Sequence, residues 1–155
     1  MKVMFISSMG GHLTELMRMK ELFSEVDFRI VTEKTKTTEY LSEEYPGKVD
    51  YLVYGTKHHL FSYLFIFAFN ILKSFVLFLK FRPKCVITTG THTAVPMCYI
   101  AKLFGRKVVY IETFANAESK TVAGKLVYPI ADLFIVQWES MLELYPKAVY
   151  GGWIF

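Results

Sequence analysis

The sequence of 155 residues lacks most of the motifs that identify metal, nucleotide-hydrolysing or esterase sites. It has only two cysteines, Cys85 and Cys98, which are not in CxxC spacing and fall in apolar segments. No His/Cys spacing typical of zinc, no Asp-x-Asp pair for a sugar nucleotide's metal and no GxSxG elbow is present. These absences predict no metal and no cofactor, and they indicate core thiols in a reduced, cytoplasmic protein.

Charged residues are also scarce, at 21% of the chain, with a formal net charge of +4. A mild basic excess fits an anionic membrane surface or an anionic ligand. Nucleic acid is the weakest partner class, because no RRM, KH, zinc-finger or arginine-rich pattern occurs. A secretory signal is not expected either, since the apolar run Val3–Ile6 is short and leads into a loop without a cleavage site.

Apolar residues are abundant instead, at 53%, and aromatic residues reach 17%. That apolar share is above the usual range for a soluble domain, so part of it is expected to be buried outside the protein's own core. The length predicts a single domain over residues 1–155.

The chain opens with a strand-like run, a loop Ser8-Met9-Gly10-Gly11, and helical spacing over 13–22. Glycine lets the backbone turn sharply and approach a ligand, and the start of a helix favours an anion. We therefore expect a phosphate to bind at Ser8, Gly10 and Gly11, with His12 beside it as a titratable group. The alternative is an ordinary tight turn with a capping serine. The spacing matches neither GxGxxG nor a P-loop.

Strand-like and helix-like segments alternate along the rest of the chain. We expect strands over 3–6, 28–32, 49–54, 84–88, 107–111, 133–138 and 148–150, with helices over 13–22, 60–79, 97–104 and 124–130 and a helical turn over 141–145. Near-continuous apolar strands alternating with helices predict an α/β fold, a Rossmann-like parallel sheet flanked by helices. Ligands in such sheets bind beyond the carboxyl ends of the strands, where the strand order reverses.

Three candidate site segments follow expected strand ends: the glycine loop with His12, the small-residue loop 89–96, and Glu112. The second loop adds Gly90, Thr91, His92 and Thr93 as candidate ligand contacts. A carboxylate at the position of Glu112 must face the crevice or find a buried partner. The alternatives without a catalytic or binding function are that His12 is a helix-capping or surface residue and that His92 is an ordinary loop residue. Trp138 and Trp153 are most simply packing residues.

The segment Leu60–Leu79 is unusually apolar, with only Ser62, Asn70, Lys73 and Ser74 polar. A helix of this length reaches across a bilayer core, and Asn70, Lys73 and Ser74 share one narrow face of it. Basic groups flank the segment, namely Lys57, His58, His59, Lys80, Arg82 and Lys84.

Three interpretations of this helix remain open: a membrane-spanning helix, a buried crossover helix, and a crossover helix with its outer side in the membrane interface. A lysine in mid-span disfavours the first. We favour the third, with the basic flanks meeting anionic lipid headgroups. The residues expected to face the membrane are Phe61, Phe65, Phe67, Ile71, Phe75 and Phe78.

Several segments together resemble a known family. They are Ser8–Glu15, Gly90–Pro96, Tyr110–Thr113, Ser119–Lys125, Ala131–Trp138 and Tyr145–Tyr150. The chain resembles the acceptor-side, membrane-recruiting subunit of two-chain GT-B glycosyltransferases. That family includes the eukaryotic dolichol-linked GlcNAc transferase subunit and bacterial PssD/CpsF-type capsule and exopolysaccharide proteins, and it is related to MurG. Phe114 stands where MurG has an asparagine after its strand-end glutamate.

This resemblance implies the N-terminal half of a GT-B glycosyltransferase. It implies an inverting hexosyltransferase subunit, inactive alone, that binds a polyprenyl-pyrophosphate-linked sugar while a partner chain holds the nucleotide-sugar. His12 and Glu112 match motif positions in the cleft, and either is the expected general base. The alternatives are a non-catalytic membrane scaffold that recruits the catalytic partner and a stand-alone nucleotide-binding α/β domain.

The resemblance also implies a peripheral location at the cytoplasmic face of the cell membrane. The eukaryotic subunit carries an N-terminal membrane anchor, whereas this chain starts at its first expected strand, so attachment through 60–79 is expected. The aromatic segment Trp153, Ile154 and Phe155 is the expected docking surface for the partner subunit. The alternative is that Trp153 folds back onto its own sheet.

Overall fold

The structure is a computed structural model that describes the backbone of residues 1–55 and 60–154 and the side chains of these residues except 60–63. The predicted roles of Lys57, His58, His59, Phe61 and Phe155 therefore lie outside the described residues.

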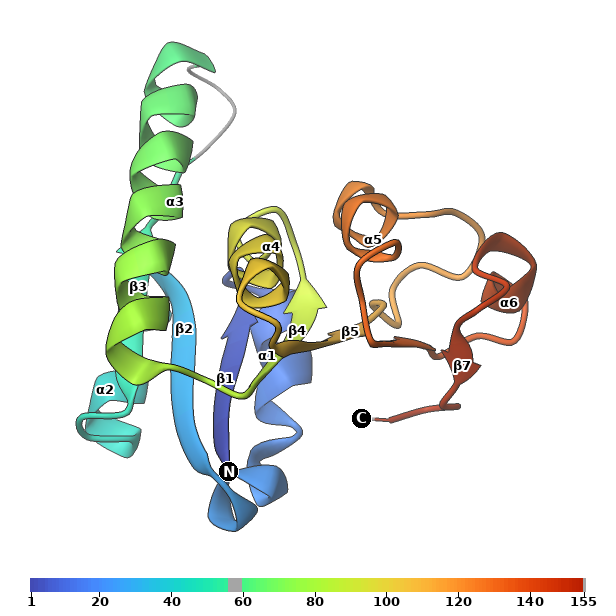
Figure 1. Ribbon diagram of the computed structural model, residues 1–155, viewed down its shortest axis with the longest axis horizontal. Coiled ribbons are helices and arrows are strands. Elements are labelled where there is room, and N and C mark those ends of the chain that lie inside the picture. The colour runs from blue at the N-terminus through green and yellow to red at the C-terminus, as the bar shows by residue number, and fades with distance from the viewer. Residues whose placement is uncertain (56–59, 155) are drawn as a thin grey trace.

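The described chain forms a seven-stranded sheet in which every paired strand is parallel to its neighbour (Figure 1). The strands are β1 (Lys2–Ser7), β2 (Asp27–Lys34), β3 (Val49–Val53), β4 (Cys85–Gly90), β5 (Lys107–Ile111), β6 (Leu133–Val136) and β7 (Val149–Tyr150). Their order is β3-β2-β1-β4-β5-β6-β7, so the direction of winding reverses between β1 and β4. The predicted parallel, doubly wound fold is confirmed.

Helices connect these strands. They are α1 (Gly11–Met17), the 3₁₀ segment η1 (Lys20–Glu25), α2 (Leu41–Glu44), α3 (Leu60–Phe81), α4 (Val95–Leu103), α5 (Val122–Val127) and α6 (Met141–Leu144). The expected first helix is thus two segments, because hydrogen bonds tighten to the 3₁₀ pattern after Met17. The apolar spacing still continues, since Leu16, Met19 and Phe23 are all buried.

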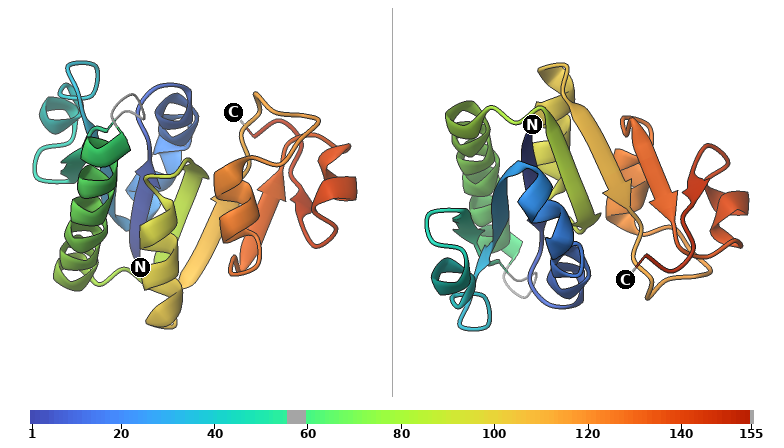
Figure 2. Two further views of the ribbon diagram at one scale, coloured as in Figure 1. Left: turned by 90° about the horizontal axis from the view of Figure 1, so that it is seen from above. Right: turned by 90° about the horizontal axis from the view of Figure 1, so that it is seen from below.

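Two apolar cores lie on opposite faces of the sheet. Figure 2 (left) shows α3, α4 and α5 side by side on one face, where Phe78, Met97 and Val127 pack against strand residues such as Val86. Figure 2 (right) shows α1 and η1 on the other face, where Leu16 belongs to the second core. Cys98 belongs to the first core and Cys85 to the second, and both thiols are buried and free.

Helix α3 turns its polar side inward. Asn70 is buried, accepting a hydrogen bond from the Val53 amide (2.9 Å) and donating one to the Val53 carbonyl (2.8 Å), and Ser74 is fully buried one turn later. The outer side carries exposed apolar residues, namely Leu64, Phe65, Phe69, Ile71, Leu72, Phe75, Val76 and Leu79. A surface helix of a soluble protein normally shows the reverse pattern.

Two residues predicted for the membrane side lie elsewhere. Phe78 is only 2% exposed, because its ring packs into the core and contacts Phe104, so its assignment to the membrane face is wrong. Phe67 is partly buried, beside Pro96 in a pocket between α3 and α4. The apolar face instead runs through Phe65, Leu72 and their exposed neighbours.

Helix α3, which carries the apolar face, also reaches the carboxyl edge of the sheet. Its first turns extend past the ends of the strands (Figure 1). By length and composition, Leu64–Phe81 is the one stretch of helix in the described residues that could cross a membrane, although the core helix of a soluble protein passes the same test.

Candidate functional site

The loops that follow β1, β4 and β5 meet at the carboxyl edge of the sheet, as predicted for His12, Thr91 and Glu112. The first two loops are tied together, because the Ser8 amide donates to the Gly90 carbonyl (3.1 Å) and the Ser8 and Thr91 hydroxyls lie 2.9 Å apart. This pair of loops therefore forms one rigid rim at the point where the strand order reverses.

Gly90 makes this junction possible. Its φ of 102° lies in the region that side chains rarely adopt. An added Cβ would also stand 3.2 Å from the Tyr110 hydroxyl and 3.3 Å from Nδ1 of His12. Gly90 is therefore a packing requirement of the site rather than an open contact for a ligand.

His12 is held by β4 through two hydrogen bonds. Its Nδ1 lies 2.8 Å from the Thr89 carbonyl oxygen, and the Thr89 hydroxyl donates to the His12 carbonyl (2.7 Å). A carbonyl oxygen only accepts, so Nδ1 carries the proton. In the neutral imidazole the lone pair is then on Nε2, which makes no hydrogen bond within the described residues. This arrangement leaves Nε2 able to accept a proton.

Glu112 lies at the predicted edge but does not face the crevice. It is 1% exposed, and its carboxylate accepts hydrogen bonds from the hydroxyls of Thr121 (2.9 and 3.0 Å) and Tyr145 (3.0 Å) and from the Thr113 amide (3.2 Å). Burial raises the pKa of Glu112, although these hydrogen bonds oppose the shift. Of the two outcomes expected for Glu112, the structure therefore shows the second, a buried carboxylate with hydrogen-bond partners.

Gly124 closes the space around this carboxylate. An added Cβ would overlap Oε2 of Glu112 and the Tyr145 hydroxyl, and the Thr121 hydroxyl also caps the Gly124 amide at 2.9 Å. Glu112 thus anchors the start of α5 to the end of β5.

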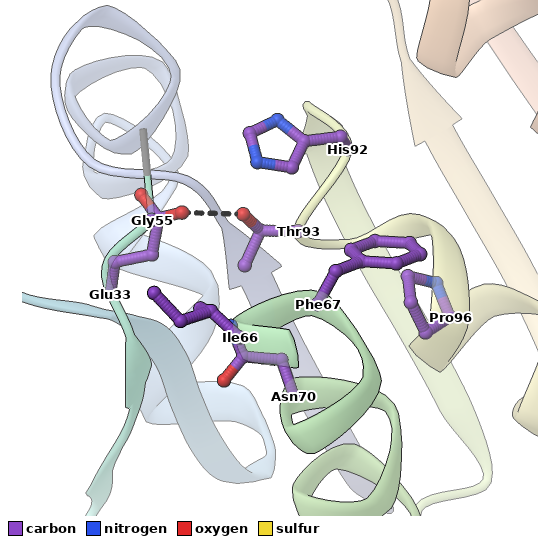
Figure 3. A pocket seen from close by; sticks show the side chains of 8 residues that line it. All are labelled: Glu33, Gly55, Ile66, Phe67, Asn70, His92, Thr93 and Pro96. Atoms are coloured by element: carbon purple, nitrogen blue, oxygen red, sulfur yellow. Dashed lines mark hydrogen bonds between the residues drawn. The ribbon is translucent and has the colours of Figure 1, made fainter. Parts of the chain in front are cut away.

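Glu33 is a buried carboxylate that was not among the predicted site residues. It is 3% exposed and comes from the end of β2 (Figure 3). The Thr93 hydroxyl donates to its Oε1 (2.6 Å) and the Met9 amide donates to its Oε2 (3.2 Å). Glu33 therefore fixes both loops of the site. Its position directly after an apolar strand is the same signal that identified Glu112.

The remaining predicted contacts divide into open and closed positions. Gly10 and Gly11 are exposed, with no heavy atom within 4 Å of a built Cβ, so their backbone is accessible. Gly10 is the N-cap of α1, and no serine caps the helix. Thr93 is buried by its bond to Glu33, so its hydroxyl does not face the open side.

Two hollows flank these loops. Thr91 and His92 line one of about 260 Å³ with the start of α5. His92 also lines a small pocket with Glu33 and Asn70, which connects the site to α3 (Figure 3).

The C-terminal segment returns to the same edge on the side of α1 (Figure 2, right). Trp153 is 76% exposed, and one face of its ring stacks on Phe114 at 5.4 Å. The Ile154 amide donates to the Gln137 side chain (3.3 Å), and the Trp138 indole donates to the Phe114 carbonyl (2.7 Å). Trp153 thus folds back onto its own domain while most of its surface remains available.

Comparison with known proteins assigns a family to this arrangement. Residues 55–154 match the family described as "Oligosaccharide biosynthesis protein Alg14 like". The mouse protein named UDP-N-acetylglucosamine transferase subunit ALG14 is 29% identical over 178 residues, covering 98% of this chain and 82% of its own length. The rat protein of the same name is 34% identical, covering 76% of this chain and 55% of its own length, and the human one is 40% identical, covering 51% and 39%.

Solved structures share the fold at low identity. MurG of Acinetobacter baumannii superposes with a TM-score of 0.74 at 14% identity, covering 90% of this chain and 42% of that protein. UDP-GlcNAc 2-epimerase of Neisseria meningitidis, solved bound to UDP-GlcNAc, gives 0.71 at 16% identity and covers 97% and 44%. The seven-stranded sheet thus corresponds to one half of a GT-B structure. The match over more than half of its length shows that the chain belongs to the Alg14-like family of oligosaccharide biosynthesis proteins.

Proposed function

We propose that this chain is the acceptor-binding, membrane-associated subunit of a two-chain, inverting glycosyltransferase. Its relatives are named as subunits of a UDP-N-acetylglucosamine transferase, which supports a nucleotide-sugar donor held by a partner chain. The acceptor that we propose is a polyprenyl-pyrophosphate-linked sugar. The resemblance to PssD/CpsF-type proteins supports a role in the assembly of capsule or exopolysaccharide. In that role the growing saccharide is a lipid-linked oligosaccharide.

The acceptor's pyrophosphate is proposed to lie against the first loop. The accessible backbone of Gly10 and Gly11 supports this place, since amides in the first turn of a helix have no intrahelical acceptor. The Thr91 hydroxyl and His92 border the same rim and offer further donors. Glu33 contributes indirectly, because it holds Met9 and Thr93 and so fixes the spacing of the two loops.

The single observation that carries the proposal is the hydrogen bond between Nδ1 of His12 and the Thr89 carbonyl, which leaves Nε2 to act as a base. In the proposed reaction the acceptor hydroxyl gives its proton to Nε2 of His12 as its oxygen attacks the anomeric carbon of the donor. The bond from that carbon to the nucleotide diphosphate breaks, and the configuration inverts. Glu112 is assigned an anchoring role, because its oxygens are buried and occupied.

A peripheral location at the cytoplasmic face of the membrane is part of this proposal. The outer side of α3 exposes Phe65, Phe69 and Leu72, while Asn70 binds the helix to the edge of the sheet. A helix bound along the sheet in this way suits a position in the membrane interface rather than across the bilayer. Lys80, Arg82 and Lys84 follow the helix and would meet anionic headgroups.

The partner subunit is proposed to dock at the carboxyl edge, with Trp153, Ile154 and Phe155 among its contacts. Exposed aromatic anchors typically dominate interface energy, each worth about 2 kcal/mol or more on truncation. The exposure of Trp153 supports this role.

The test is affinity copurification of the full chain with the product of the neighbouring gene, followed by a transfer assay with a panel of nucleotide sugars and prenyl-pyrophosphate-linked acceptors. We expect transfer by the complex with UDP-GlcNAc as donor. Deletion of residues 152–155 should abolish copurification while the domain stays folded. Binding of a nucleotide by this chain alone, with no partner and no transfer, would favour a stand-alone nucleotide-binding domain and refute the proposal.

A further inference from the structure

A further hollow lies on the α1 side of the sheet, away from α3. It is lined by Thr14, Glu15, Arg18, Phe114 and Trp153, and it encloses about 190 Å³. For comparison, an engineered apolar cavity of about 150 Å³ holds one benzene molecule. The hollow is therefore large enough for one six-membered ring and opens to solvent for its substituents.

One wall of this hollow is aromatic. Phe114 and Trp153 stack with an interplanar angle of 20°, and the ring of Trp138 contacts that of Phe114 with the centroids 4.7 Å apart. An aromatic wall suits a ligand with an apolar face. A pyranose ring has such a face, formed by its axial C–H bonds, and a rim of hydroxyls around it.

Glu15 of α1 and Arg18 at the C-cap of that helix supply a hydrogen-bond acceptor and a cation to the same hollow. Oε1 of Glu15 accepts from the Thr113 hydroxyl (2.8 Å) and the Phe114 amide (3.1 Å). Oε2 of Glu15 is buried and accepts no hydrogen bond from the described residues. The guanidinium of Arg18 makes no ion pair and donates no side-chain hydrogen bond within the same residues.

An unpaired buried carboxylate oxygen is unfavourable, and a ligand hydroxyl that reaches Oε2 would supply the missing donor. The guanidinium of Arg18 offers donors to ring or phosphate oxygens. We propose that this hollow is a subsite for a pyranose ring. The proposal rests on the proposed function, because the ring is the acceptor's own sugar. The ring stacks against the Phe114–Trp153 wall, a hydroxyl donates to Glu15, and Arg18 donates to an oxygen of the ring substituents.

The position of the hollow fits the path that we propose for a lipid-linked acceptor. Glu15 follows His12 by three residues, so both side chains project from one side of α1 toward the strand ends. The exposed face of α3 lies on the other side of the sheet. A lipid-linked acceptor would thus run from the membrane, past the two loops and His12, to the hollow.

The two tryptophans of the chain allow a direct test. Their indole N–H signals in a ¹⁵N–¹H spectrum of the full chain can be assigned with Trp138→Phe and Trp153→Phe. The probes are N-acetylglucosamine 1-phosphate, glucose 1-phosphate and galactose 1-phosphate, with uridine monophosphate and inorganic phosphate as comparators. We expect at least one sugar phosphate to shift the Trp153 signal saturably and more strongly than either comparator.

Arg18→Ala and Glu15→Gln should each weaken this binding by at least about fivefold, as expected for the loss of a hydrogen bond to a charged group. Glutamine keeps an oxygen for Thr113 and Phe114, so the loop is expected to stay folded, which the rest of the spectrum reports. The matched controls are Lys20→Ala and Glu25→Gln, two exposed positions on η1, which should bind as the wild type does.

Three results would overturn the subsite: no shift with any sugar phosphate, an equal shift with uridine monophosphate or phosphate, or unchanged binding by both variants. Transfer by the two-chain complex is measured in parallel. An active complex without a Trp153 shift refutes the subsite alone. A sugar-dependent shift without any transfer retains a sugar site and refutes the proposed function.

Discussion

Nδ1 of His12 donates to the carbonyl oxygen of Thr89 across 2.8 Å, which ties the first helix of the chain to the end of a strand 77 residues away. This bond sets both the tautomer and the direction of the imidazole. His12 and Glu112 both follow strands in the sequence, but they differ in exposure. His12 is partly exposed at the edge of the sheet, whereas Glu112 is buried.

His12→Asn should lower kcat of the complex by about 10²- to 10⁴-fold, the usual contribution of a general base. The asparagine amide can still donate to the Thr89 carbonyl but has no basic nitrogen in place of Nε2. His92→Asn is the matched variant, and it should mainly raise KM for the acceptor. Copurification and steady-state kinetics check both. Unchanged kcat in the His12 variant would contradict its role as the base.

Glu112→Gln should remove a pH dependence from the stability of the fold. Burial raises the pKa of Glu112 above its ordinary value of 4.5, so the folded protein binds this proton more tightly than the unfolded chain. The contribution of Glu112 to stability is then complete below that value and is lost as pH rises through the folded pKa. As pH rises through this range, the wild type should lose unfolding free energy relative to the glutamine variant. The loss should be about 1.4 kcal/mol for each unit by which the folded pKa is raised.

Urea unfolding of both proteins across this pH range measures the difference. Glu118→Gln, at an exposed position, is the control and should follow the wild type at every pH. A difference between Glu112→Gln and wild type that stays constant with pH would show that the carboxylate has no perturbed titration.

Asn70→Ala should lower the free energy of unfolding by about 1–3 kcal/mol, because the Val53 amide and carbonyl lose their partner. Ser74→Ala is a matched variant on the same side of α3. The Ser74 hydroxyl is buried without a hydrogen-bond partner in the described residues, so its removal should be neutral or stabilising. Chemical denaturation compares the two, and equal losses would contradict the anchoring role of Asn70.

Phe65→Glu with Leu72→Glu should release the protein from vesicles that contain anionic lipid, since both side chains are exposed on α3. Burial of one large apolar side chain is worth about 1.5–3 kcal/mol, so we expect the affinity to fall by more than about tenfold. The control is Leu22→Glu with Val149→Glu, two exposed apolar positions away from α3.

Flotation with phosphatidylglycerol and phosphatidylcholine vesicles measures this binding. Full retention of the α3 double variant on anionic vesicles would contradict the interfacial role. Unfolding of that variant would show that the outer side of α3 is core.

The alternation of apolar strands with helices was sufficient to predict the parallel sheet and the edge where the site lies. It did not predict the orientation of α3, because apolar residues surround most of that helix and either side could face the sheet. The contact between Asn70 and Val53 decides the orientation, and a single sequence does not reveal that pairing. Phe78 was misassigned for the same reason.

Long-range contacts also explain what the sequence left undecided at the site. Glu33 and Glu112 each follow an apolar strand, yet their burial depends on Thr93 and on Thr121 with Tyr145, which come from distant segments. The stacking of Trp153 on Phe114 is another pairing of this kind. Local patterns therefore identified the positions of the site residues but not which of them face the solvent.

The most direct test of the two-chain account is a titration of separately purified subunits in the transfer assay. We predict no transfer by either chain alone and activity that rises with added partner and saturates at an equimolar ratio. With His12→Asn the complex should keep its stoichiometry while kcat falls by about 10²- to 10⁴-fold. Full transfer by this chain alone, or by the partner alone, would contradict the account.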